Sequence, residues 1–487
     1  MIILLLVPML LGLVQIFNFY IMKINKTYLK SQKGLLLLLL LLTSCEKFVD
    51  IKQSTTQRLT ESVNDAQLIL NNYSQMNVNY PADGELSADN YYLNDPGFVS
   101  LTNQTDRDLY VWSLTAIRDG GQWLAPYSVI YYSNLALETA DKFKGTTDLS
   151  NFQNVRGQAL FFRANCFWQL AQIYCKPYSV MGASSDPGVP LRITSDINEK
   201  SDRGTLQQTY EKIISDLQEA AVLLPNINGV SSRPNKAAAY ALLARVYLSM
   251  ENYPLALSNA NAALEINSQL LDYNTLSLTS ATPFARFNKE VLFHSVMVSL
   301  PPLNPGSATN NIAKIEPSLY ASYNNNDLRK QLFFKANSGT DVGSFRFSGN
   351  YDSSTSAALF NGLAVDELFL IRAECYARAG SIVEALSDLN TLLRTRWITG
   401  TYNNVTALNA EEALMKILVE RRKELIMRGQ RWTDLRRLNK DNRFAVTLTR
   451  TVNGTTYNLR PNDARYTLLI PEIVISNSGN SIYQNNR

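Results

Sequence analysis

The chain has 487 residues, with 46 Lys and Arg against 42 Asp and Glu, four cysteines and one histidine. Four of the basic residues and no acidic residue fall within positions 1–44, so the remaining chain carries both signs in equal number, which excludes general electrostatic attraction to nucleic acid. A single histidine, with no Cys-x-x-Cys pair and no glycine-rich phosphate loop, argues against a metal, a nucleotide or another cofactor.

The first predicted element is an export signal. Four lysines between positions 23 and 33 precede eight consecutive leucines at 35–42. This run is too short to span a bilayer, which takes about 20 residues, but it fits the apolar core of a secretory signal. The sequence Leu-Thr-Ser-Cys at 42–45 resembles the lipobox of bacterial lipoproteins, so we expect cleavage before Cys45 and a lipid on its thiol. The alternative is an ordinary buried cysteine.

Residues 1–21 carry no charge and are long enough to cross a membrane. Two apolar segments in series make a poor signal peptide, so we predict that translation starts at Met22; the alternative is an N-terminal anchor helix. In either case, we treat residues 1–44 as a signal region that is removed, and we predict a single domain over residues 45–487.

Helical hairpins are predicted along much of that domain. Residues 205–224 have apolar side chains on one helical face, with Thr205 and Gln208 as a capping box and Pro225 as a stop. Two later hairpins repeat one pattern of small and aromatic residues that resembles tetratricopeptide (TPR) repeats. The pattern uses Ala244, Tyr247, Tyr253, Ala256, Ala260 and Ala263 in one copy and Ala373, Tyr376, Gly380, Ile382, Ala385 and Leu389 in the other.

The two copies lie much farther apart than the roughly 34 residues of a continuous TPR array. We therefore predict a mainly α fold, in which TPR-like helical hairpins near 121–175, 205–267 and 363–396, with a C-terminal helix at 409–439, form an α-α superhelix scaffold. Long loop-rich insertions with a few short strands separate the hairpins. The alternative is that alanine-rich amphipathic helices merely imitate the TPR spacing.

Three insertions, residues 76–110, 178–204 and 270–360, are rich in Asn, Ser, Pro, Gly and Tyr. A tyrosine ring beside amides and carboxylates suits the apolar face and the hydroxyls of a sugar. The candidate ligand contacts are Tyr80, Asp89, Tyr91, Tyr92, Asp95, Tyr320, Tyr323, Asn324 and Asp327. We expect two insertions to contribute one ring each to a shared shallow site, with at most one of Tyr91 and Tyr92 facing the ligand. For each tyrosine, packing within its loop is the alternative.

The stretch ERRKELIMRGQRWTDLRR near the C-terminus is the most distinctive. Glu424 and Arg428 are spaced as an i,i+4 ion pair, and Arg431 and Asp434 as an i,i+3 pair. Trp432 lies on the apolar side of the predicted helix, so we expect its ring to be buried. A solvated basic face is the alternative, whereas a nucleic-acid patch conflicts with export and with a net charge of zero.

This stretch resembles the C-terminal signature of the SusD/RagB family of outer-membrane lipoproteins. The matching positions are Glu420-Arg421, Glu424-Leu425, Gly429, Arg431, Asp434-Leu435 and Arg437. The tail also resembles the family ending, at Ile470-Pro471 and Gln484-Asn485. Arg428 and Val474 stand where the family usually has glutamate.

The resemblance implies a lipid-anchored protein of the outer membrane, exposed at the cell surface, that binds glycan oligosaccharides and delivers them to a SusC-like TonB-dependent transporter without catalysis. The alternatives are the same role with peptide ligands, a TPR scaffold for outer-membrane assembly, and a glycoside hydrolase with two carboxylates. The resemblance also implies that the signature residues brace the scaffold rather than touch ligand. These are Glu420, Arg421, Glu424, Arg431, Trp432, Asp434 and Arg437.

Overall fold

The computed structural model describes residues 60–487 except residue 201. The predicted signal, its Met22 start and the lipid-bearing Cys45 lie outside the described residues. The chain divides into two compact units, residues 1–60 and 61–487, and the second contains every element discussed below. Within the described residues, no helix combines the length and the apolar character that crossing a membrane requires.

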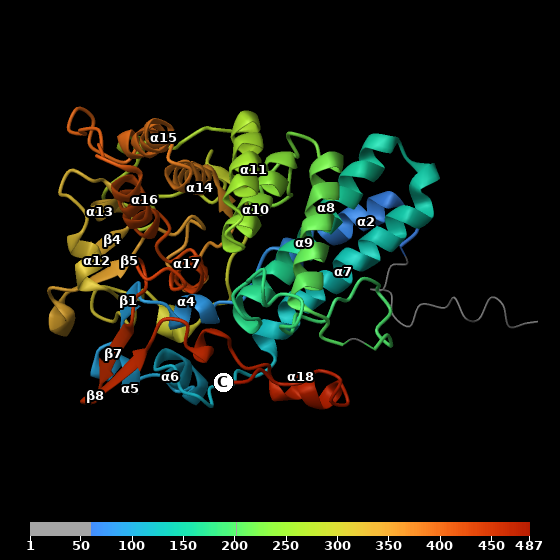
Figure 1. The fold of residues 1–487 in the computed structure, drawn as a ribbon, viewed down its shortest axis with the longest axis horizontal. Helices are drawn as coiled ribbons and strands as arrows, with labels where there is room; N and C mark the ends of the chain where they lie inside the picture. The colour runs from blue at the N-terminus through green and yellow to red at the C-terminus, as the bar shows by residue number, and fades with distance from the viewer. Residues whose placement is uncertain (1–59, 201) are drawn as a thin grey trace, which may run out of the picture. The chain divides into compact units, whose positions relative to one another are not determined.

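Long helices that pack one against the next form the scaffold of the second unit (Figure 1). They are α2 (Val63–Leu70), α7 (Gly121–Phe143), α8 (Leu149–Tyr174), α9 (Leu206–Leu223), α10 (Lys236–Ser249), α11 (Tyr253–Ile266), α14 (Val365–Arg378), α15 (Ile382–Arg394) and α16 (Ala410–Glu424). Helix α2 packs on α7 and α8, and from α7 to α11 each helix packs on the next; α11 then packs on α14, and α14 on α15 and α16. The predicted mainly α fold of TPR-like hairpins is confirmed.

The local signals that predicted these helices are present in the structure. The Thr205 hydroxyl accepts from the Gln208 N–H at 3.1 Å, and the Gln208 side-chain oxygen accepts from the Thr205 N–H at 2.8 Å. This reciprocal capping box satisfies two donors that the first turn of α9 would otherwise leave unpaired. The helix ends at Leu223, just before Pro225.

The two TPR-like copies also share the turn between their helices. Glu251 (φ 60°) and Gly380 (φ 83°) occupy the same left-handed position. In each turn the N–H of the following residue donates to the carbonyl of Tyr247 or Tyr376, at 2.9 Å in both copies. The second copy has the residue that this backbone conformation favours, because glycine alone adopts it without strain.

Shorter elements lie between and after the scaffold helices. The helices are α3 (Tyr73–Met76), α4 (Asp83–Ser87), α5 (Asp95–Val99), α6 (Gln104–Tyr110), α12 (Pro317–Ala321), α13 (Arg329–Leu332), α17 (Arg431–Leu438) and α18 (Glu472–Asn477). The 3-10 turns are η1 (Lys144–Thr146), η2 (Tyr273–Thr275), η3 (Pro301–Leu303), η4 (Gly339–Asp341) and η5 (Ala464–Tyr466). The strands are β1 (Tyr91–Tyr92), β2 (Val291–Phe293), β3 (Lys314–Ile315), β4 (Phe334–Ala336), β5 (Phe345–Phe347), β6 (Leu363–Ala364), β7 (Leu448–Val452) and β8 (Thr455–Leu459).

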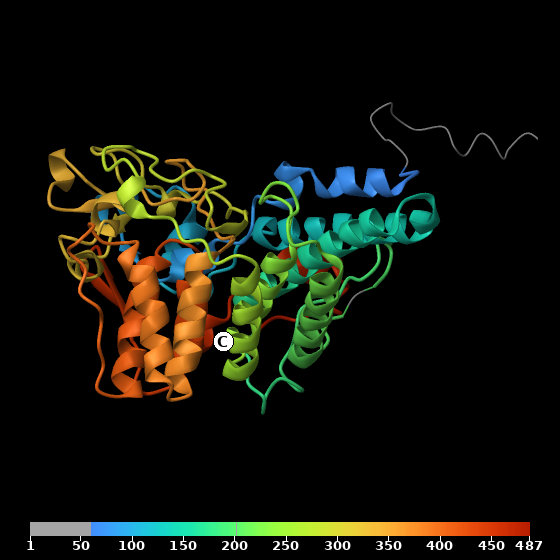
Figure 2. The same cartoon turned by 90° about the horizontal axis from the view of Figure 1, so that it is seen from above.

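An antiparallel sheet in the order β1-β3-β5-β4 joins two insertions that are far apart in the sequence. Strand β1 comes from the insertion at 76–110, and the other three strands come from the insertion at 270–360. Figure 2 shows the second insertion, in yellow and gold, gathered on one side of the orange helices α14 to α16. Strands β2 and β6 form a second pair, and β7 and β8 form a hairpin.

The predicted single helix at 409–439 is wrong, because the structure has two helices there, α16 and α17. The turn between them contains Met427 (φ 58°) and Gly429 (φ 72°), a backbone conformation that no α-helix contains. The Gly429 N–H donates to the Glu85 carboxylate at 3.0 Å rather than within a helix. The turn redirects the chain, so that α17 meets α4 instead of continuing α16.

The carboxylate of Glu424 lies at the centre of a buried ion network. One oxygen accepts from Arg396 at 2.7 Å and the other from Arg329 at 2.8 Å, and none of these three side chains is exposed. Arg396 also donates to Glu290 at 2.8 Å. Burial alone would raise the pKa of Glu424, but the two guanidinium groups lower it, so the carboxylate is ionised.

The local ion pairs predicted for the signature are replaced by long-range pairs. Arg428 pairs with Asp366, and its guanidinium lies over the rings of Tyr351 and Phe360. Asp366 of α14 therefore supplies the counter-charge for the arginine that stands where the family usually has glutamate. Arg431 pairs with Asp89 at 2.6 Å, so the carboxylate of Asp89, a predicted ligand contact, is engaged within the protein.

Helix α17 is held by residues that precede it and by residues that follow it in the sequence. Asp434 accepts from Arg421 and from Arg437, each at 2.9 Å, and Arg437 also reaches Glu374 of α14 at 2.6 Å. Trp432 is 1% exposed, as predicted, and its ring packs on that of Tyr466 with centroids 4.7 Å apart. These contacts fix the orientation of α17, whose last turn forms part of the cavity described below.

We expect Gly380→Ala to lower the free energy of unfolding by about 1–2 kcal/mol, because a left-handed conformation costs roughly that much in a residue with a Cβ. The added methyl group itself meets no atom within 4 Å. Urea unfolding followed by circular dichroism measures the change. Gly121→Ala is the control, since its Cβ also meets nothing within 4 Å and its φ is not positive. Equal losses in both variants would contradict the assignment of strain.

We expect Glu424→Gln to lower the free energy of unfolding by about 3–5 kcal/mol, because it leaves two buried guanidinium groups without their shared counter-charge. Glu411→Gln, at the exposed start of the same helix, makes the same chemical change and should stay within about 0.5 kcal/mol of the unmodified protein. Urea titration of both variants provides the comparison. A Glu424 variant as stable as the Glu411 variant would show that the network does not support the fold.

Candidate binding site

Four of the nine candidate ligand residues are buried and engaged within the protein. The hydroxyls of Tyr80, Tyr91 and Tyr323 donate to backbone carbonyls at 2.7–2.8 Å, and Asp327 accepts from Arg329 at 2.7 Å. None of the four is more than 2% exposed. The prediction that they contact ligand is wrong, because neither the three tyrosine rings nor the Asp327 carboxylate reaches the surface. Asp89 is partly exposed, but Arg431 and Arg422 both pair with its carboxylate.

The remaining candidates, Tyr92, Asp95, Tyr320 and Asn324, reach the surface but do not form one site. Tyr92 lies opposite Lys314 in the sheet, and Lys314 lies opposite Arg346, so these residues share one face. Tyr320 stacks at 3.6 Å on Phe345, which precedes Arg346 in β5 and leaves the strand on the other face. The expected shared platform of Tyr92 and Tyr320 is therefore absent.

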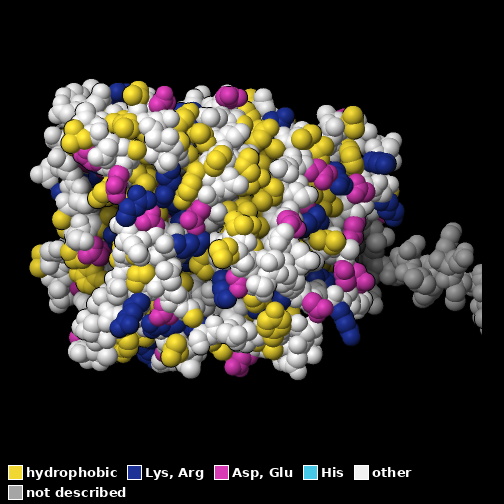
Figure 3. Space-filling model, viewed as in Figure 1, with side chains coloured by type: hydrophobic (Ala, Val, Ile, Leu, Met, Phe, Trp, Pro, Cys, Tyr) yellow, Lys and Arg dark blue, Asp and Glu magenta, His cyan; other side chains and the backbone are white. Residues whose placement is uncertain are grey.

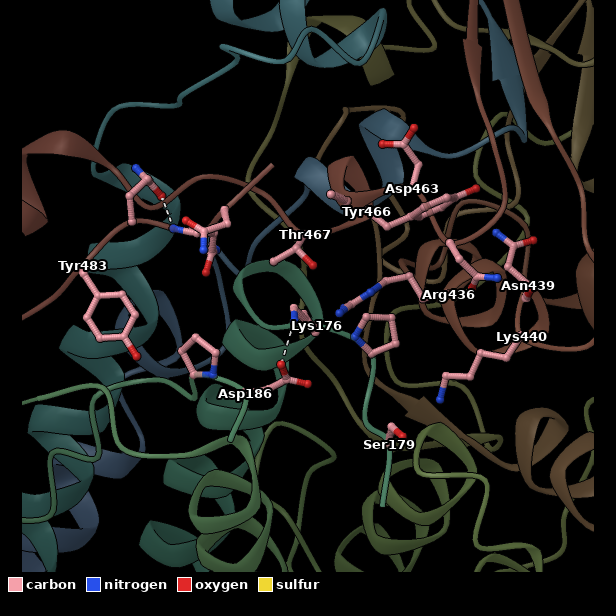
Figure 4. A pocket seen from close by; sticks show the side chains of 17 residues that line it. Lys176, Ser179, Asp186, Arg436, Asn439, Lys440, Asp463, Tyr466, Thr467 and Tyr483 are labelled. Atoms are coloured by element: carbon pink, nitrogen blue, oxygen red, sulfur yellow. Dashed lines mark hydrogen bonds and ion pairs between the residues drawn. The ribbon is translucent and has the colours of Figure 1, made fainter. Parts of the chain in front are cut away.

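A cavity of about 440 Å³ lies elsewhere, where the segment after α8, helix α17 and the C-terminal tail meet (Figure 4). Its rings are those of Tyr466, Tyr483, Pro177 and Pro187. Its amide side chains are those of Asn439, Asn462, Gln484, Asn485 and Asn486. Its charged side chains are those of Lys176, Asp186, Arg436, Lys440 and Asp463. Rings for apolar faces and amides for hydroxyls occur together here, as polar ligands require.

The tail forms one wall because two amides attach it to the scaffold. Gln484 both accepts from the Ile470 N–H and donates to the Ile470 carbonyl, at 2.8 Å each. Asn485 donates to the carbonyls at the end of α8 and near η5, at 2.9 and 2.7 Å, and accepts from Arg203 at 2.9 Å. The family-like Gln484-Asn485 pair is thus a clamp, and it leaves the neighbouring Tyr483 ring 56% exposed.

Most charged groups of the cavity wall have a partner of opposite sign. Lys176 pairs with Asp186 at 2.7 Å, and Lys440 and Asp463 pair with groups outside the wall, at 2.5 and 2.8 Å. Arg436 differs, since its two terminal nitrogens donate to the carbonyls of Gln172 and Cys175 at the end of α8 and no carboxylate pairs with it. Burial lowers the pKa of Arg436 to about 10, which still leaves it cationic at neutral pH.

Sequence reasoning missed Tyr466 and Tyr483. The signal was present, because the tail reads IYQNN, a ring followed directly by amides, which is the pattern sought in the insertions. The tail was assigned only to the family ending. Position in the chain, rather than composition, is what distinguishes this run from those in the insertions.

Other hollows occur in the described chain, and one of them also combines amide side chains with an exposed ring. One, of about 710 Å³, lies between loops near 226–235 and 287–292 and is lined by amides with Phe287 as its ring. Another, of about 510 Å³, is a largely aliphatic groove beside α16 that includes Val405, Met415 and Val419. On the face shown in Figure 3, basic and acidic side chains are interspersed. Among the described residues, no three His, Cys, Asp or Glu side chains are grouped so that they could hold a metal ion.

The fold and the site define a class of protein: a TPR-like helical scaffold whose tail and loops enclose a cavity of rings and amides. Two family models match the chain: a SusD-like model described as "Starch-binding associating with outer membrane" over residues 46–248, and the SusD family model, named SusD_RagB, over residues 363–479. The chain belongs to the SusD/RagB family.

Relatives agree with this assignment along most of the chain. SusD-like protein P38 of Formosa agariphila is 24% identical over 85% of this chain and 91% of its own length, and SusD-like protein P2 of the same organism is 25% identical over 66% and 72%. A SusD superfamily structure from Bacteroides thetaiotaomicron has a TM-score of 0.72 at 23% identity, covering 88% of this chain and all of its own. A putative sugar binding protein from Bacteroides vulgatus has a TM-score of 0.70 at 22% identity, covering 88% and 99%.

Proposed function

We propose that the protein binds glycan oligosaccharides in the cavity between α8, α17 and the tail, and performs no reaction on them. The observation that carries this proposal is the exposed Tyr483 ring within a wall of amides. A sugar can place its apolar face on such a ring while its hydroxyls bond to the amides. The family description and the sugar-binding name of a structural neighbour support a glycan over a peptide.

The carboxylates of the cavity support binding rather than hydrolysis. A glycoside hydrolase needs one carboxylic acid that stays protonated, with a raised pKa, near a second carboxylate. Hydrogen bonds from Arg465 lower the pKa of Asp463 instead, and Lys176 holds Asp186 in an ion pair. Thin-layer chromatography of oligosaccharides incubated with the protein tests this, and catalytic turnover would overturn the proposal.

We further propose that residues 45–487 form one functional unit at the cell surface, attached to the outer membrane by lipid on Cys45. The unit would deliver captured glycan to a partner SusC-like TonB-dependent transporter. The order of lysines, leucines and Leu-Thr-Ser-Cys at the N-terminus supports the anchor. The match to a family described as associating with the outer membrane supports the location.

We expect Tyr483→Ala to weaken glycan binding about 5- to 150-fold, if losing a stacking ring costs about 1–3 kcal/mol as base stacking on aromatic residues does. Calorimetry of the purified protein against a panel of glycans and peptides identifies the ligand and measures the loss. Tyr92→Ala and Tyr320→Ala serve as comparisons, because these rings are the surface candidates of the insertions. Binding that survives Tyr483→Ala but fails in either comparison would move the site to the insertions.

We expect Cys45→Ala to accumulate as a precursor without lipid, because the acylated thiol is removed. Metabolic labelling with a fatty acid, followed by cell fractionation, measures the change. Cys166→Ala is the control, since its thiol is buried within the fold and should not affect acylation. A Cys45 variant that is still acylated and membrane-bound disproves the anchor, and mature protein that resists protease on intact cells disproves surface exposure.

A further inference from the structure

Three polar atoms at the wall of the cavity have no hydrogen-bond partner: Nε of Arg436, Nδ2 of Asn439 and the hydroxyl of Tyr466. Their side chains are only 3%, 1% and 2% exposed. Buried polar atoms are normally paired, so three in one wall call for an explanation. Burial raises the pKa of Tyr466 to about 12, and the nearby Asn439 amide opposes this shift, but the two groups do not form a hydrogen bond of ordinary geometry.

The unpaired atoms are donors rather than acceptors. Nε of Arg436 and Nδ2 of Asn439 can only donate, and the Tyr466 hydroxyl can donate as well. The acceptor of the Asn439 amide is already occupied, because it accepts from the Val446 N–H at 3.1 Å. Figure 4 shows the three side chains on one side of the cavity, with Arg436 extending towards its centre. A group rich in acceptors could pair with all three atoms.

The positive charge of Arg436 also favours a partner that supplies acceptor atoms. The other four charged groups of the wall are in ion pairs, whereas Arg436 has only backbone carbonyls at the C-terminal end of α8. Those carbonyls carry partial negative charge, so they stabilise the buried guanidinium. They occupy its terminal nitrogens and leave Nε without a partner. An anion in the cavity would meet a cation that no protein carboxylate neutralises.

We propose that the cavity selects an acidic glycan, whose uronate carboxylate or sulfate ester is held by Arg436, Asn439 and Tyr466. This inference rests on the proposed function and names its substrate class. Carboxylate and sulfate oxygens only accept, which matches three donors, whereas a neutral sugar hydroxyl presents a donor as well. Tyr483 would stack on the ring of the same sugar or of the next one in the chain.

The test compares a charged probe with its neutral counterpart in calorimetry on the purified protein. The probes are tetragalacturonate, its full methyl ester, maltotetraose, a sulfated carrageenan tetrasaccharide, and a tetrapeptide with a free C-terminal carboxylate. We expect one of the two acidic glycans to bind at least tenfold more tightly than both neutral glycans. The galacturonate and carrageenan arms distinguish a carboxylate from a sulfate ester.

Variants then locate the binding of the acidic probe. Asn439→Asp keeps the shape and the occupied acceptor but replaces the free donor by a negative oxygen, and should weaken acidic binding at least tenfold. Tyr466→Phe removes only the hydroxyl and should weaken it severalfold. Asn403→Asp makes the same change at an exposed position outside the cavity and should bind as the unmodified protein does. Circular dichroism melting confirms that each variant is folded.

Each remaining outcome bears on one proposal or on both. Equal affinity for acidic and neutral glycans, or acidic binding that survives Asn439→Asp in the folded protein, overturns the acidic specificity and leaves glycan binding intact. Binding of the peptide alone, or of no probe, overturns both.

Discussion

The carboxylate of Glu424, enclosed by the guanidinium groups of Arg396 and Arg329, is the interaction on which the rest of the structure depends. The three groups come from α16, from the segment just after α15 and from the insertion at 270–360, so one buried acid joins scaffold and insertion. Charges this deep are tolerated only when they are fully paired, because removing them from water is expensive. The network therefore admits one arrangement of these segments and penalises others.

That arrangement of segments sets the geometry of the cavity. Helix α17 provides Arg436 and Asn439, and it is oriented by Asp434, Arg437 and Trp432. The opposite wall is the tail, which hydrogen bonds attach to the end of α8. Residues that match the family signature thus act at one remove from the cavity. They position a helix whose other residues, outside the signature, face the cavity.

The helices were predictable because their signals are local. A capping box, an apolar face and a turn residue each lie within a few positions of one another, as at α9 and at Gly380. The ion pairs were not predictable, because Glu424 and Arg431 have plausible partners three or four residues away and use distant ones instead. The break at Met427–Gly429 was missed for a related reason, since the bond from Gly429 to Glu85 is a tertiary contact.

The tyrosines show where composition stops being informative. A tyrosine in a polar loop can donate its hydroxyl to a backbone carbonyl and bury its ring, as Tyr80, Tyr91 and Tyr323 do, and its neighbours in the sequence look the same in either case. Alternation along β1 did predict that Tyr91 and Tyr92 diverge. It could not predict that Tyr320 stacks on the opposite face of the sheet from Tyr92, because that depends on the register of β3 with β5.

The order of the network along the chain has a consequence for biogenesis. Glu290, Arg329 and Arg396 all precede Glu424, so synthesis from the N-terminus supplies both central cations before the acid that they share. Before α16 is made, Arg329 can pair with Asp327 and Arg396 with Glu290, but no acid joins the two pairs. The link between the insertion at 270–360 and the scaffold therefore forms only after nearly the whole polypeptide has been made.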